Sequence, residues 1–304
     1  MQAVVLVNIF ASSVILAFIP TLAMPEAVMS GSPTTTPERG FSNEYYEKGL
    51  LPLLQEREFE ALESATRQVQ KRFENGTLSE IQLRNIYRQF YNLDEPTLAR
   101  VEAWKNAIPR SYAAHLILGV HFKRKAGDVR GGKYIIQTPP DKIQSMQQFN
   151  EIAFSELNHS LDLADKPFLS VFQLLEISKT RGDKELSRGL VIAANKMLPS
   201  NTLARNRFMM SLTPRWGGSY EEMKQFITQS KTEEVSPSGI SQLEAIMYDD
   251  MAMTYLEQRD RQNATAYFFK ALALAQSVGG DFRRDWLFFA NIHVCGDQDL
   301  KKYC

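Results

Sequence analysis

The sequence predicts an all-α fold, an α-solenoid built from tetratricopeptide-like pairs of antiparallel helices. Apolar residues recur at helical spacing through most of the chain, and short turns containing Gly, Pro or Asn separate the segments. No segment shows the sustained apolar and polar alternation of a half-buried strand. The composition agrees with this class, because 44% apolar and 23% charged residues are ordinary for a globular protein that buries a core.

Residues 1–23 form the first segment, which carries no charged side chain and is almost wholly apolar from Ala3 onward. Pro20 ends the apolar run shortly before the small residue Ala23, a plausible signal-peptidase site. We therefore expect a signal peptide at residues 1–23. The alternative is an uncleaved inner-membrane anchor formed by residues 3–23, because the run approaches the roughly 20 residues that span a bilayer. Both interpretations predict an exported protein, periplasmic or secreted when the segment is cleaved.

Residues 24–40 are expected to form a flexible linker, because this stretch is rich in Ser, Thr, Pro and Gly. The helical-repeat domain is expected to occupy residues 41–304. Its first helical pattern covers Leu50 to Phe73, and Asn75-Gly76 stops it.

A Thr77-x-x-Glu80 capping box is expected to start the next helix. Further helices are predicted at 95–107, 111–126, 141–164, 168–181, 184–198, 202–211, 219–230, 238–258, 261–277 and 281–294.

Small and large apolar residues in the last part of the chain follow tetratricopeptide spacing, which predicts a repeat at residues 245–278 with its turn at Arg259-Asp260. The residues that carry this pattern are Tyr248, Met251, Ala252, Tyr255, Ala264, Phe268 and Ala271. A weaker unit is expected at 168–201, and a third is interrupted by an insertion at 127–146. A generic helical bundle is the alternative.

Four segments resemble a known bacterial family, the domain of unknown function numbered 4034 (DUF4034), which is associated with tetratricopeptide-like and Sel1-like helical repeats. They are LLQEREF with FENG, WKNAIPRSYAA, Arg130-Gly131 and LTPRWGGS, and they span most of residues 50–230. The chain departs from the family pattern at Lys125-Ala126, where a Trp is expected. The resemblance implies the fold and a bacterial origin, and it implies no established activity.

The segment Pro214 to Glu222 has a structural interpretation, because Pro214 bars helix and Ser219 with Glu222 forms a capping box. In the functional interpretation Arg215, Trp216 and Tyr220 bind a partner, since the amides of a helix N-terminus favour a carboxylate or a peptide end. We also expect Arg215 to form a buried ion pair and to stack on Trp216.

No catalytic residue, metal site or cofactor is predicted. His115 and His121 fall on different faces of one helix, so they cannot ligate a metal together. Asp249-Asp250 is interpreted as part of a solvated helix face. Cys295 and Cys304 could join His293 as metal ligands, but a disulfide is the commoner state of two cysteines in an exported protein.

The balanced charge and the absence of common catalytic motifs reduce the classes of function that the sequence supports. Thirty-five basic residues balance thirty-five acidic ones, which disfavours nucleic acid and anionic membrane surfaces as partners. The sequence lacks a P-loop, a G-x-S-x-G elbow and an H-E-x-x-H motif.

We therefore expect an exported helical-repeat protein that binds a peptide or protein partner without catalysis. It would contact a membrane only if the N-terminal segment is uncleaved. The alternatives are a periplasmic immunity-type inhibitor of a secreted toxin and a hydrolase-like enzyme with a cleft around Arg215–Glu222.

Overall fold

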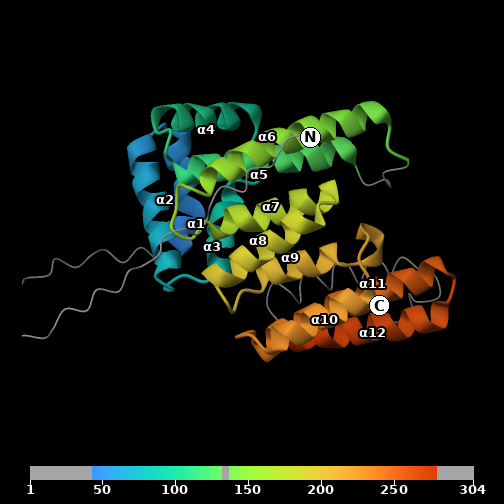
Figure 1. Ribbon diagram of the computed structural model, residues 1–304. Helices are drawn as coiled ribbons and strands as arrows, with labels where there is room; N and C mark the ends of the chain where they lie inside the picture. The colour runs from blue at the N-terminus through green and yellow to red at the C-terminus, as the bar shows by residue number, and fades with distance from the viewer. Residues whose placement is uncertain (1–42, 132–136, 279–304) are drawn as a thin grey trace, which may run out of the picture. The chain divides into compact units, whose positions relative to one another are not determined.

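The computed structural model describes residues 43–131 and 137–278, and every regular element in them is a helix, so the predicted all-α class is confirmed. In chain order (Figure 1) the elements are α1 Asn43–Gln55, α2 Phe59–Glu74, α3 Glu80–Tyr87, η1 Arg88–Phe90, α4 Glu95–Ala107, α5 Tyr112–Arg130, α6 Pro140–Ser160, α7 Phe168–Arg181, α8 Lys184–Met197, α9 Leu203–Ser211, η3 Pro214–Trp216, α10 Tyr220–Lys231, α11 Pro237–Glu257 and α12 Arg261–Val278. The expected signal peptide, linker, final helix at 281–294 and disulfide between Cys295 and Cys304 lie outside the described residues.

The helical pattern expected over Leu50 to Phe73 is divided between two helices, α1 and α2. Arg57 lies between them with φ of 61°, in the left-handed region. This conformation lets the amide of Glu58 donate to the carbonyl of Leu53 at 2.9 Å, which closes the end of α1. Spacing alone misses the break, because arginine is an uncommon residue for a left-handed turn.

The capping box that starts α3 lies two residues after the predicted one. Ser79 is the N-cap, and its hydroxyl accepts from the amide of Gln82 at 3.2 Å while the Gln82 side chain accepts from the Ser79 amide at 2.9 Å. The prediction of Thr77 and Glu80 was therefore wrong. The hydroxyl of Thr77 instead donates to the carbonyl of Arg72 at 3.0 Å.

The helices from α5 onward pack against their neighbours along the chain. α5 packs against α6, α7 against α8 and α11 against α12, and α6, α8 and α10 contact the helices that follow them, α7, α9 and α11. The first helices form a continuous row in which α5 contacts α7, α7 contacts α9 and α9 contacts α11. We call α5, α7, α9 and α11 the first-helix row. Such nearest-neighbour packing is typical of helical-repeat proteins.

The segment predicted as an insertion, residues 127–146, lengthens a helix pair instead of interrupting it. Residues 127–130 continue α5, and residues 140–146 begin α6. The two helices approach closely at Gly119, where an added Cβ would lie 2.5 Å from Cγ of Leu157. A glycine is therefore needed at this contact.

The segment in which the repeat is expected forms a helix pair, α11 and α12, and α11 begins at Pro237, earlier than position 245. Ala252, Ala264, Phe268 and Ala271 are buried between the two helices. Arg259 adopts φ of 62° in the turn, and the Asp260 carboxylate accepts from the amide of Asn263 at 3.1 Å to start α12.

A large apolar cluster runs through the described part of the chain from α1 to α11, and a second, smaller one of Ala252, Ala264 and Phe268 lies between α11 and α12. Trp104 is fully buried within the large cluster. Within residues 43–131 and 137–278, no helix combines the length and the hydropathy needed to cross a bilayer.

Candidate functional site

The loop between α9 and α10 is fixed by its own backbone. Pro214 starts the short helix η3, and Gly217 then adopts φ of 81°. Gly218 is packed so closely that an added Cβ would lie 2.0 Å from the carbonyl oxygen of Leu212. Ser219 caps α10 by accepting from the amide of Glu222 at 3.1 Å, as its sequence position predicted.

Arg215 and Tyr220 converge on Asp250 of α11. The Nε atom of Arg215 donates to Oδ1 of Asp250 at 3.0 Å, and the Tyr220 hydroxyl donates to Oδ2 at 3.1 Å. The Tyr220 hydroxyl also lies 2.6 Å from the hydroxyl of Thr254. These contacts tie the loop to α11, so both side chains have a structural role.

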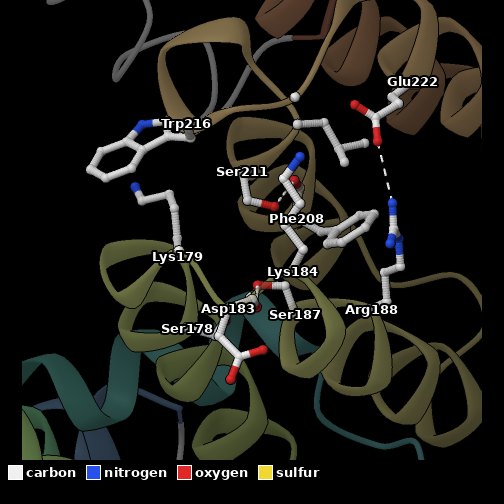
Figure 2. A pocket seen from close by; sticks show the side chains of 13 residues that line it. Ser178, Lys179, Asp183, Lys184, Ser187, Arg188, Phe208, Ser211, Trp216 and Glu222 are labelled. Atoms are coloured by element: carbon white, nitrogen blue, oxygen red, sulfur yellow. Dashed lines mark hydrogen bonds and ion pairs between the residues drawn. The ribbon is translucent and has the colours of Figure 1, made fainter.

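Two expectations about these residues need correction. Asp250 is 6% exposed, so the solvated-face interpretation is wrong for it. Arg215 does form the expected ion pair, but its side chain is 51% exposed and only the carboxylate is buried. The cation that covers the ring of Trp216 is Lys179, whose Nζ lies 4.9 Å from the ring centroid. Figure 2 shows Lys179 rising from α7 toward the indole.

A group of charged side chains surrounds Glu176 on the first-helix row. Lys179 Nζ lies 3.0 Å from Oε1 of Glu176, and Arg207 of α9 pairs with Oε2. The guanidinium of Arg207 also lies 4.6 Å from the ring centroid of Phe172. Lys123 of α5 completes this set, because its charge acts on Glu176. We call Lys123, Glu176, Lys179 and Arg207 the cationic group.

Burial and positive charge oppose each other in the cationic group. Burial favours a raised pKa for Glu176, but the charges of Arg207, Lys179 and Lys123 outweigh it and hold the pKa well below its usual value. Burial, followed by the charge of Arg207, lowers the pKa of Lys123 to about 7. Glu176 is therefore ionised, and the Lys123 ammonium is the least stable charge of the four.

Lys123 differs from its neighbours in having no counter-ion of its own. Within the described residues, Glu176 directs one oxygen to Lys179 and the other to Arg207, and no hydrogen bond or ion pair reaches the Lys123 ammonium. The side chain is partly buried. An unpaired ammonium in such a position is costly, because burial removes its water.

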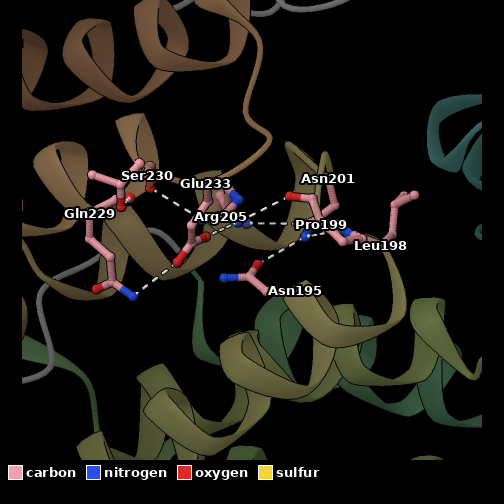
Figure 3. Close-up of polar contacts among 9 residues, drawn as sticks. Asn195, Leu198, Pro199, Asn201, Arg205, Gln229, Ser230 and Glu233 are labelled. Carbon is pink, nitrogen blue, oxygen red and sulfur yellow. Dashed lines mark hydrogen bonds and ion pairs between the residues drawn. The ribbon is translucent and has the colours of Figure 1, made fainter.

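Arg205 of α9 is a buried charge that has a full set of partners, and it therefore has a structural role. It lies two positions before Arg207, so it points to the opposite side of α9. Its side chain is 1% exposed, and it pairs with Glu233 while donating to the carbonyl of Pro199 at 3.1 Å and to the hydroxyl of Ser230 at 3.2 Å (Figure 3). Within the described residues, the Lys123 ammonium has no such carboxylate, carbonyl or hydroxyl partner.

A small cavity lies beside the loop, between α7, α8, α9 and α10 (Figure 2). Trp216, Phe208 and Lys184 are among its lining residues, and Lys184 donates to the carbonyl of Gly217. Its volume is about 20 Å³, which holds one water molecule. A ligand larger than a water molecule does not fit inside this cavity.

The histidines form a structural contact and no metal cluster within the described residues. His115 is buried, its Nδ1 lies 2.6 Å from Oε2 of Glu156, and its Nε2 lies 3.1 Å from the carbonyl of Pro109. His159 lies against His115 with 4.4 Å between the ring centroids. His293, Cys295 and Cys304 lie outside the described residues.

Of the sequence-predicted residues, the fold brings together Arg215, Trp216 and Tyr220 in one loop. Sequence reasoning missed the cationic group, because its members come from three separate helices. The i, i+3 spacing of Glu176 and Lys179 was a visible signal of an ion pair. Nothing in the spacing links either residue to Lys123 or Arg207.

A family model described as domain of unknown function (DUF4034) matches residues 49–195. The match agrees over these residues with the sequence resemblance to the DUF4034 family. The match includes Lys123, Glu176 and Lys179, while Arg207 and the loop at Leu212–Ser219 lie beyond it. No curated protein and no solved structure matches the chain.

Proposed function

We propose that this is an exported helical-repeat protein that binds a peptide or protein partner and does not catalyse a reaction on it. One observation carries the proposal: cations from α5, α7 and α9 lie together, and Lys179 of this group covers the partly exposed ring of Trp216 in the η3 loop. Stacked helix pairs usually function by presenting an extended surface of this kind. The charge-free segment at residues 1–23 supports export.

Trp216 is the side chain that we assign to partner contact. Its indole is partly exposed, and Lys179 covers its ring. Tryptophan and arginine are enriched among the residues that dominate binding energy at interfaces. Arg215 and Tyr220 act through Asp250, so we assign them the role of holding the loop that presents Trp216.

Selection from a phage-displayed random peptide library, with the exported protein as bait, tests the proposal. Trp216→Ala is expected to weaken the selected peptides by about tenfold or more, since hot-spot residues contribute about 2 kcal/mol or more. Ile192→Ala is the matched control, because Ile192 is an exposed apolar residue of α8 that lies outside this face. A library that yields no saturable binder, or equal affinities for both variants, contradicts the proposal.

A further inference from the structure

We infer that the cationic group binds a carboxylate of an acidic peptide, with the Lys123 ammonium as the anchor of that carboxylate. The inference rests on the proposed function in taking the ligand to be a peptide. It adds the chemistry that is recognised and the residue that recognises it.

The charge balance of the group is the first argument. Lys123, Lys179 and Arg207 carry three positive charges around one carboxylate, and both oxygens of Glu176 are already engaged. Lys179 is only 8% exposed, so solvent screens its charge weakly. A second carboxylate beside Lys123 supplies the missing counter-charge, and it does so only when a ligand brings it.

The position of the group is the second argument. Its cations come from α5, α7 and α9, which are consecutive helices of the first-helix row. The three helices therefore converge on one point of the row, where a carboxylate side chain of a peptide can approach all three cations. Trp216 lies beside Lys179 and is partly exposed, so it offers apolar surface to a neighbouring side chain of the peptide.

The donors that remain available favour a carboxylate over a phosphoryl group. Arg207 and Lys179 are shared with Glu176, which leaves the Lys123 ammonium as the uncommitted donor of the group. A phosphoryl group has three strongly accepting oxygens and needs several free donors. One ammonium suits the smaller charge of a carboxylate.

The protonation of Lys123 supports this role. Burial and the charges of Arg207, Arg124 and Lys179 lower its pKa to about 7, and Glu176 acts in the opposite direction. A ligand carboxylate favours the ammonium form, so binding raises the pKa and takes up a proton. The affinity for an acidic peptide is therefore expected to fall as the pH rises above 7.

The test compares two acetylated octapeptides, one of alternating alanine and glutamate and one with glutamine in place of glutamate. Titration at low ionic strength and about pH 6 is expected to show about tenfold or greater preference for the glutamate peptide. Lys123→Met keeps the apolar stem and is expected to abolish the preference. Lys142→Met, which removes an exposed charge of α6, controls for net charge and is expected to retain it.

A second measurement follows the Lys123 ammonium directly by NMR after reductive ¹³C-methylation. Its pKa is expected to rise when the glutamate peptide is added and to stay constant with the glutamine peptide. Equal affinities for the two peptides, equal losses in Lys123→Met and Lys142→Met, or an unchanged pKa overturns the inference. Stronger displacement by inorganic phosphate than by acetate overturns the assignment to a carboxylate.

The two proposals fail in different ways. If the library selection yields binders that show no preference for acidic residues, the inference of an acidic ligand is wrong and the proposal of peptide binding still holds. A failed selection, together with a Lys123 pKa that does not respond to the glutamate peptide, removes both.

Discussion

Glu80 caps a helix that begins more than a hundred residues later in the chain. Its Oε1 atom accepts from the amide of Thr202 at 2.6 Å, from the Thr202 hydroxyl at 2.8 Å and from the amide of Leu203 at 3.2 Å. The carboxylate is 6% exposed and lies in the first turn of α3. One side chain thus satisfies donors at the start of α9 and joins α3 to the helix that carries Arg207.

Glu80→Ala is expected to lower the free energy of unfolding by about 2–4 kcal/mol, because it leaves buried donors of Thr202 and Leu203 without an acceptor. Urea unfolding followed by circular dichroism measures the change. Glu185→Ala is the control, since Glu185 is an exposed acid in the first turn of α8. A loss in Glu80→Ala no larger than that of the control shows that the contact adds nothing to stability.

The sequence predicts the helix boundaries well where a glycine or a capping residue stands at the end or the start of a helix. Gly182 and Asp183 end α7 and start α8 as expected, because glycine adopts the left-handed C-cap and aspartate accepts from the first-turn amides. No glycine or capping residue stands at the break between α1 and α2, where Arg57 lies. At the start of α3, Thr77 with Glu80 and Ser79 with Gln82 both match the pattern of a capping box. The Glu80 contact was invisible, because local periodicity says nothing about residues distant in sequence.

Lys123→Met is expected to raise stability near neutral pH while it weakens binding. The folded state holds the Lys123 pKa at about 7, below the 10.5 of an unfolded chain. The folded protein therefore binds fewer protons in this window, and the wild type becomes more stable as the pH rises from 7 to 10.5. The variant lacks this penalty, so its advantage is about 1–3 kcal/mol at pH 7 and disappears at high pH.

Urea unfolding of both proteins at neutral pH and above pH 10 checks this prediction. Lys142→Met is again the control, and its stability is expected to stay within about 0.5 kcal/mol of the wild type. An Lys123→Met protein that is less stable at neutral pH means that the ammonium serves the fold, and the ligand-binding role of Lys123 is then wrong.

Asp249→Asn is expected to stabilise the protein in mildly alkaline solution. Burial, followed by the negative charge of Asp250, raises the pKa of Asp249 from 3.8 to about 7. The folded state therefore binds an extra proton between these values, and the wild type loses stability as the pH rises through them. Asparagine removes the charge, so the gain is about 1–2 kcal/mol at pH 8 and smaller at pH 5.

Thermal unfolding at the two pH values measures the effect, with Asp128→Asn on the exposed side of α5 as the control. The prediction fails when the gain is the same at both pH values, because a pH-independent gain points to packing instead of ionisation.

Some features of the candidate site could be predicted from the local sequence, and others could not. The Ser219 cap and the turn after Pro214 follow from residue types that have few alternatives at those positions. The sequence favours a solvated face for Asp250, because adjacent residues on a helix point about 100° apart and Asp249 and Asp250 therefore do not form a pair. The structure buries Asp250 because Arg215 and Tyr220, which come from the loop, supply its partners.

Gly218 lets the loop pass close to the end of α9. An added Cβ at Gly218 would lie 2.0 Å from the carbonyl oxygen of Leu212, and this oxygen belongs to the backbone, so no side-chain rotation relieves the contact. Gly189, in the interior of α8, has no atom within 4 Å of the corresponding position. The same substitution at these two glycines is therefore expected to have opposite effects.

Gly218→Ala is expected to lower the free energy of unfolding by about 1–3 kcal/mol, because the backbone has to move to make room for the methyl group. The displacement moves Trp216 away from Lys179, so peptide binding is also expected to weaken. Gly189→Ala is expected to raise stability by about 0.5–1 kcal/mol, since alanine favours a helix interior and binding is left unchanged. Urea unfolding and peptide titration of both variants check these outcomes. If Gly218→Ala unfolds like the wild type and binds peptide equally well, the loop tolerates the methyl group and its backbone does not position Trp216.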